Sequence, residues 1–146
     1  GIFIRNVEAD VTIENVDISG VAYPINTGGN IKAGINLTVK NSKLTGWTSP
    51  ASFDKVVFTG CEFKKGSYFG EEADPSWNAC FRAATNTVLE DCTFDKDFYI
   101  SLATMVEGRT LTLKSCNVDG TVISSTNIAT LLKGAEEDTL KNVKFE

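Results

Sequence analysis

The chain has 146 residues, with 14 Lys and Arg against 19 Asp and Glu, a net charge of −5 and no histidine. This length suits one domain with its own hydrophobic core. The charges are spread along the chain without a basic run, which argues against a nucleic-acid partner, since such a partner needs a positive face. No apolar run approaches the roughly 18 residues of a membrane-spanning helix, and no signal peptide is recognisable, so membrane insertion is not expected.

The chain opens on an apolar segment and then repeats one pattern of eight residues. Residues 1–4 read as a strand without a cap, so we expect the sequence to be a fragment of a longer protein. The pattern occurs at 11–18, 37–44, 56–63, 87–94, 111–118 and 138–145. Its third-position apolar residue recurs after 26, 19, 31, 24 and 27 residues. A core of fixed length with insertions of variable length is typical of a solenoid.

Apolar residues predominate at positions one, three, six and eight of the repeat unit, with Thr87, Asp138 and Ser42 as exceptions. This is the strand period on either side of the fifth position. The fifth residues are Asn15, Asn41, Gly60, Asp91, Ser115 and Asn142. These residue types tolerate the left-handed backbone region or bond to their own backbone. One such residue bends a strand while both arms keep their apolar side chains toward one interior. Each unit is therefore predicted to be strand, one-residue corner, strand.

A closed coil needs a third strand ahead of each unit. The candidates are residues 1–4, 30–33, 50–53, 78–81, 102–105 and 128–132. We therefore predict an all-β fold, a single-stranded right-handed parallel β-helix of about six coils with three parallel sheets, as one domain over residues 1–146. An antiparallel β-sandwich is the alternative fold, because many short strands would suit it as well.

The run Val-Thr-Ile-Glu-Asn-Val-Asp-Ile-Ser-Gly at 11–20 and its repeats resemble the coils of the pectate-lyase-like right-handed β-helix superfamily. The resemblance covers nearly the whole chain and implies the fold. It does not imply one activity, because that superfamily holds lyases, hydrolases, adhesins, phage tailspikes and inert stalks.

Long flank loops are expected at 19–30, 64–77 and 119–127, and shorter loops at 46–50 and 95–99. The loops at 46–50, 64–77 and 95–99 leave the coil at the same corner, so they should emerge side by side, and such a flank is usually the working face. The candidate ligand-binding residues there are Trp47, Tyr68, Phe69, Trp77 and Tyr99, with Phe98 beside them. Aromatic rings next to carboxylates suit a sugar, because rings stack on the pyranose and carboxylates accept from its hydroxyls. The alternative is a satellite core beneath the loops, with the acids simply solvated.

An enzyme of this kind would be a polysaccharide lyase or glycoside hydrolase. Its acid–base residues would come from Glu71, Glu72, Asp74, Asp95 and Asp97. A glycosidase needs two carboxyl groups at a fixed separation on rigid elements. The resemblance implies that hydrolases of the superfamily keep this cluster on strands. The corresponding positions here are Lys32, Ser52, Arg82 and Thr104, without a carboxylate pair.

For a lyase, the resemblance implies a basic residue beside acid-bound calcium. The nearest equivalent in this chain is Arg82 with Asp54 or Glu107. The run 95–97 lacks the remaining spacing of a calcium loop. No cofactor is predicted, and calcium stays an alternative that no motif supports.

Cys61, Cys92 and Cys116 share the sixth position of successive units, where an inward stack of small core groups is expected. Neighbouring rungs would bring two of them within disulfide range, so one bond between neighbours stays open. A zinc site is not predicted, because the chain has no histidine and stacked thiols do not form a tetrahedron. Cys80 is expected in the core of a third-sheet strand.

Residues 127–135 fit two structures. Ile128, Leu131, Leu132 and Ala135 have a helical spacing, with a candidate N-cap at Thr126 or Asn127. We favour a strand over a helix, because the distance to Leu140 matches the earlier coils. Without a helical cap, both ends of the solenoid would expose sheet edges, which implies a neighbouring domain or self-association.

The sequence therefore predicts a non-catalytic β-helix module that contacts glycan through its flank loops. The resemblance implies a bacterial or phage surface protein and an extracellular or cell-surface location. A polysaccharide lyase or hydrolase is one alternative, and a structural spacer without ligand is another.

Overall fold

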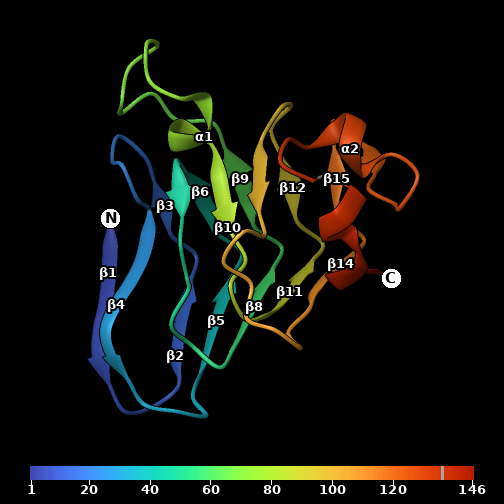
Figure 1. Cartoon of the computed structure of the whole chain (residues 1–146). Helices are drawn as coiled ribbons and strands as arrows, with labels where there is room; N and C mark the ends of the chain where they lie inside the picture. Colours follow the sequence, from blue (N-terminus) through green and yellow to red (C-terminus); the bar gives the residue numbers. More distant parts are fainter. Residues whose placement is uncertain (136) are drawn as a thin grey trace.

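The computed structural model describes residues 1–135 and 137–146 and shows an all-β chain whose strands pair almost entirely in parallel (Figure 1). This arrangement is consistent with a β-solenoid and confirms the prediction of an all-β fold with parallel sheets. The alternative antiparallel sandwich is wrong, because β15–β16 is the one antiparallel pair among the named strands of the described residues.

The first arms of the repeat units form one six-stranded parallel sheet. Its strands are β2 (Val11–Glu14), β5 (Asn36–Lys40), β8 (Lys55–Thr59), β11 (Asn86–Glu90), β14 (Leu111–Lys114) and β17 (Val143–Phe145). Val11 lies opposite Leu37, which lies opposite Val56, so the first positions of successive units are aligned as predicted.

The second arms form another six-stranded sheet. Its strands are β3 (Asp17–Ile18), β6 (Lys43–Thr45), β9 (Glu62–Lys64), β12 (Thr93–Phe94), β15 (Asn117–Val118) and β16 (Thr121–Val122). The last of these turns back on β15 through Asp119 and Gly120, whose φ angles are 48° and 80°. The predicted loop at 119–127 therefore begins as a tight hairpin, the kind that an Asp-Gly pair favours.

A single residue with positive φ separates the two arms in each of the first five units. The φ angles are 57° at Asn15, 47° at Asn41, 63° at Gly60, 52° at Asp91 and 53° at Ser115. The predicted one-residue corner is confirmed for these units. Position 60 requires glycine for a second reason, because a Cβ there would lie 2.7 Å from Oδ1 of Asn41 on the neighbouring corner.

A third group of parallel strands, called the third face, lies ahead of the units. It consists of the pair β1 (Ile2–Val7) and β4 (Ile25–Ile31), and of the sheet β7 (Trp47–Thr48), β10 (Cys80–Arg82) and β13 (Tyr99–Ser101). An isolated bridge between Asn26 and Ser49 joins the two parts, and another joins Tyr99 to Lys133.

Several predicted boundaries on this face are wrong. The strands at 50–53 and 102–105 do not form, since those segments turn toward the first sheet and the strands lie earlier, at β7 and β13. The strands predicted at 30–33 and 78–81 are shifted, to β4 and β10. Because β4 starts at Ile25, residues 25–30 are strand rather than loop. The predictions assumed a constant distance to the next unit, whereas the turns between the third face and the first sheet differ in length.

The end of the chain departs from the repeat. Residues 128–132 begin as the helix α2 (Ile128–Leu131), so the favoured strand is wrong and the helical alternative is correct. Ile128, Leu132 and Ala135 are buried at helical spacing. A 3₁₀ helix, η1 (Glu137–Asn142), follows, and β17 places Val143 opposite Leu111. Val143 thus holds the first position of a unit rather than the sixth, and the predicted alignment of 138–145 is wrong.

All three groups of strands contribute to one hydrophobic core. Its centre is aromatic: the ring of Phe63 lies 5.6 Å from Phe58, 5.3 Å from Phe81 and 4.9 Å from Phe94. The three sixth-position cysteines are buried free thiols, and contacts with Cys116 and Cys61, together with burial, raise the pKa of Cys92. Cys80 is also buried and free, but it lies outside the core cluster. Among the residues that the structure describes, no helix is long and apolar enough to cross a membrane.

Candidate functional site

A groove of about 540 Å³ lies over β7, β10 and β13, on the side of the sheet that faces away from the core. Trp47, Cys80 and Tyr99 form its floor and flanks. One wall comes from residues 74–76, at the start of the short helix α1 (Pro75–Asn78), and the other from residues 101–103 and Gly134.

The register of the sheet brings Trp47 and Tyr99 into one row. Cys80 lies opposite Trp47 on one side and opposite Tyr99 on the other. The next residues of the same strands, Thr48, Phe81 and Ile100, are fully buried in the interior. Strand alternation thus sends one row inward and the other outward. The two rings lie two strands apart, roughly 10 Å at the usual strand spacing, and the small Cys80 leaves a depression between them.

The ring of Trp47 packs against the ring of Tyr23, and the two ring centroids are 5.4 Å apart. The indole nitrogen Nε1 is buried and has no hydrogen-bond partner within the described residues. Because this nitrogen is covered, the part of Trp47 that a ligand could contact in the groove is the hydrocarbon surface of its ring.

The thiol of Cys80 is 3% exposed, and burial raises its pKa to about 12. A thiol is a nucleophile and a metal ligand only as the thiolate. Cys80 is therefore protonated at neutral pH and supplies a small apolar floor rather than reactivity. It is buried, as predicted, although strand alternation turns it away from Phe81 and leaves it outside the main core cluster.

The carboxylate of the groove belongs to Asp74, the N-cap of α1. Its Oδ1 accepts hydrogen bonds from the backbone nitrogen of Ser76 at 2.9 Å and from Oγ of Ser76 at 2.7 Å. These bonds lower the pKa of Asp74. The sequence Asp-Pro-Ser explains this geometry, since aspartate is a preferred N-cap and proline suits the first helical position. Oδ2 has no hydrogen-bond partner within the described residues and can accept from a ligand.

Gly134 allows the chain after α2 to close one end of the groove. The nitrogen of Ile100 donates to the carbonyl of Lys133 at 2.9 Å. A Cβ at position 134 would lie 2.6 Å from the carbonyl oxygen of Ile100, and Gly134 has φ of 76°. Both the close approach and the left-handed backbone require glycine here.

The other predicted aromatic residues lie elsewhere. Tyr68, Phe69 and Trp77 contact one another on the long loop, with ring centroids 5.2 Å and 5.6 Å apart. Tyr68 is 62% and Trp77 is 46% exposed. Asn78 fixes the loop, since its Oδ1 accepts from the nitrogen of Phe69 and its Nδ2 donates to Gly70, each at 3.0 Å. Because two of its three rings are exposed, the loop cluster does not form the inward satellite core of the alternative, and ligand contact by its three rings stays a prediction. Phe98 is fully buried in the core and is not a surface residue.

The five candidate acids do not gather in the groove. Asp95 pairs with Nζ of Lys64 at 2.9 Å and accepts from the nitrogen of Lys65 at 2.7 Å. Asp97 pairs with Lys133 at 3.5 Å. The exposed Glu71 and Glu72 are absent from the groove lining, so Asp74 is its one carboxylate among the described residues. No group of three or more acidic, cysteine or histidine residues that could hold a metal occurs in the described part of the chain.

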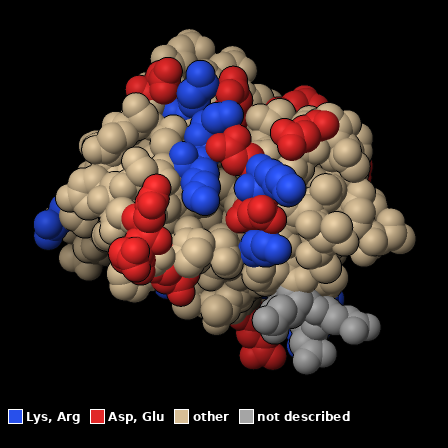
Figure 2. Space-filling model, turned by 90° about the horizontal axis from the view of Figure 1, so that it is seen from above, with Lys and Arg blue, Asp and Glu red and all other residues tan. Residues whose placement is uncertain are grey.

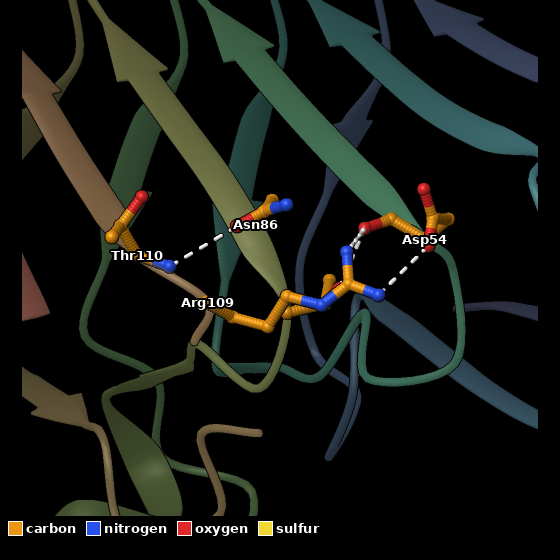
Figure 3. A network of polar contacts seen from close by, with 5 residues as sticks. Asp54, Asn86, Arg109 and Thr110 are labelled. Atoms are coloured by element: carbon orange, nitrogen blue, oxygen red, sulfur yellow. Dashed lines mark hydrogen bonds and ion pairs between the residues drawn. The ribbon is translucent and has the colours of Figure 1, made fainter. Parts of the chain in front are cut away.

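The basic residue considered for a lyase has a different partner. Nε of Arg82 donates to Oγ1 of Thr104 at 2.7 Å, so the pairing with Asp54 is wrong. Asp54 instead pairs with Nη2 of Arg109 at 3.0 Å, as Figure 3 shows. In the same network, Oδ1 of Asn86 accepts from the nitrogen of Thr110 at 3.1 Å. These contacts tie together the turns that lead into neighbouring strands of the first sheet, which is a structural role.

Charges of both signs are interspersed on the face of the molecule that Figure 2 presents. Ion pairs across neighbouring units occur in the structure, as in Lys64 with Asp95 and Lys114 with Glu90, the latter at 2.8 Å. No patch of a single sign dominates this face, which is the expected result of pairing charges from rung to rung.

Comparisons with protein-family models, with curated proteins and with solved structures found no match. The resemblance to the pectate-lyase-like superfamily therefore rests on the repeat units alone, and the function is argued from the groove.

Proposed function

We propose that this chain is a right-handed parallel β-helix of about six coils and three sheets, and that it binds glycan without cleaving it. Parallel strands joined by crossovers are right-handed in nearly all proteins, which supports the hand. The observation that carries the function is the row of Trp47, Cys80 and Tyr99 beside the carboxylate of Asp74.

The chemistry of this row suits a sugar chain that crosses the strands. The apolar faces of pyranose rings pack on aromatic side chains, and two rings about two rungs apart can contact separate sugar units. Oδ2 of Asp74 accepts from hydroxyl groups, as a few placed polar groups do in ligand sites. The resemblance of the repeat units to the pectate-lyase-like superfamily supports a bacterial or phage surface protein located outside the cell or at the cell surface.

The composition of the groove supports binding without cleavage. Glycoside hydrolysis generally needs two carboxyl groups on either side of the scissile bond. Asp74 is the one carboxylate among the described lining residues, and the thiol of Cys80 is protonated. Two alternatives remain. One is a polysaccharide lyase or hydrolase, and the other is a structural spacer without a ligand.

A glycan array with the purified wild-type protein is the first test, followed by the Trp47→Ala and Tyr99→Ala variants. We expect both variants to lose retention of the glycan that the wild type binds, with a cooperative thermal unfolding transition preserved. Phe3→Ala is the matched control, because Phe3 is an aromatic residue 56% exposed on β1, outside the groove.

The Trp77→Ala variant tests separately whether the loop cluster contributes to glycan binding. An array without hits from a folded wild-type protein would replace the proposal with the structural spacer. Shortening of a bound glycan during incubation would replace it with the enzyme.

A further inference from the structure

The groove has an unbalanced charge. Its described lining residues include one carboxylate, that of Asp74, and no lysine or arginine. The remaining lining is aromatic, aliphatic, backbone or hydroxyl in character. The carboxylate of Asp74 is therefore the one charged group in the described lining, although Arg82 lies two residues after Cys80 on the same outward row of β10.

Two basic side chains beside the groove have other partners. Lys133, which bridges to Tyr99, pairs with Asp97, and Arg82, which follows Cys80 by two residues, donates to Thr104. Neither side chain lines the groove. A carboxylate on a sugar would consequently lack an ionic partner among the described lining residues.

Asp74 is also held in place. Two hydrogen bonds from Ser76 fix Oδ1, and the cap geometry orients the carboxylate at the start of α1. These bonds favour the ionised form, so the side chain accepts hydrogen bonds but donates none. Sugar hydroxyl groups can donate to it, whereas an ionised sugar carboxylate can only accept and is repelled.

We infer that the groove selects uncharged glycans over glycans that carry carboxylates, and that Asp74 is the residue that sets this selectivity. The inference rests on the proposed function, because it specifies the ligand class of the same groove. Placing like charges together across an interface costs enough to give a preference of at least about tenfold for the neutral chain.

The test compares matched polymers. Neutral polysaccharides that the wild type retains are oxidised at C6 to the corresponding uronates, so that each pair differs in one functional group. We expect the neutral member to bind at least about tenfold more tightly at low salt, with a smaller difference at high salt because screening weakens the repulsion.

Asp74→Asn is the decisive variant, since asparagine keeps an acceptor and is itself a good N-cap. We expect it to bind the oxidised polymer about tenfold more tightly than the wild type does, with little change for the neutral polymer. Glu72→Gln is the control, because it removes the same charge from the neighbouring loop without touching the groove lining. Thermal unfolding of both variants shows that the fold is retained.

The outcomes separate the two proposals. If no polymer of either kind binds, the glycan-binding function itself fails. If the oxidised polymers bind the wild type as well as the neutral ones, the function stands and the selectivity is overturned. If Asp74→Asn and Glu72→Gln change the preference equally, the assignment to Asp74 is overturned.

Discussion

The first two sheets differ from the third face in how regularly their strands are aligned. In the first sheet five consecutive strands align through a shared register, and one left-handed residue leads from each to the second sheet. On the third face, the two groups of strands lack a continuous ladder between them and are joined by an isolated bridge between Asn26 and Ser49 and by a hydrogen bond from Oγ1 of Thr27 to the carbonyl of Ser49. The contrast teaches that the repeated corner maintains the stack, while the less regular face is free to form a groove. Four predictions test this division.

The largest effect is expected in the aromatic centre of the core. Phe63→Ala should lower the free energy of unfolding by about 3–5 kcal/mol, because it leaves a cavity among Phe58, Phe81 and Phe94. Urea unfolding followed by circular dichroism measures the change. Tyr68→Ala, at a side chain 62% exposed, should change it by less than about 0.5 kcal/mol. Equal losses would show that the loop cluster is as important to the fold as the core.

The corner should be the next most sensitive position. Gly60→Ala places a Cβ 2.7 Å from Oδ1 of Asn41 at φ of 63°, whereas Gly70→Ala has φ of 82° and nothing within 4 Å. Both variants should lose about 1–2 kcal/mol for the left-handed backbone. Gly60→Ala should lose more, since Asn41 must also shift. If both variants have the same free energy of unfolding, the close approach of Asn41 to position 60 does not affect stability.

Filling the groove floor should weaken binding and also lower stability by about 1–3 kcal/mol, because the larger side chain overpacks the buried position of Cys80. Cys80→Leu adds volume between Trp47 and Tyr99 on the side away from the core, so glycan affinity should fall about tenfold, or about 1.4 kcal/mol. Cys80→Ala is the control, because it keeps the depression open. Isothermal titration with a glycan identified on the array measures both. Unchanged affinity in Cys80→Leu would place the ligand outside this row.

The smallest effect concerns charge pairs between units. The pKa of Lys64 is raised by its hydrogen bond and ion pair with Asp95. A group whose pKa is higher in the folded state contributes stability that is complete below its unfolded pKa and lost as pH rises through the folded value. Lys64 is 41% exposed, so solvent screening limits the contribution to about 0.5 kcal/mol.

The measurement compares Lys64→Met with the wild type at pH 7 and above pH 11. The variant should be slightly less stable than the wild type at neutral pH, and this difference should disappear at the alkaline pH. A difference that persists at high pH would show that the loss comes from packing of the lysine stem rather than from its charge.

The sequence by itself determined the parts of this protein whose cause is local. The left-handed corners at Asn15, Asn41 and Asp91 could be read from residue type, because few residues tolerate that backbone conformation. The alternation of side chains on either side of each corner then predicted which of them face the core, including the buried row of Cys61, Cys92 and Cys116. It also identified Trp47 and Tyr99 as candidate ligand-binding residues.

Tertiary structure alone decided what depends on turn length and on register between distant strands. Turns of unequal length moved the strands of the third face away from their predicted places, and α2 replaced a strand where buried residues at helical spacing could pack on the core. The groove depends on Trp47 meeting Cys80, and Cys80 meeting Tyr99, across strands. No local pattern specifies such a pairing, because hydrogen bonds between strands far apart in sequence set it.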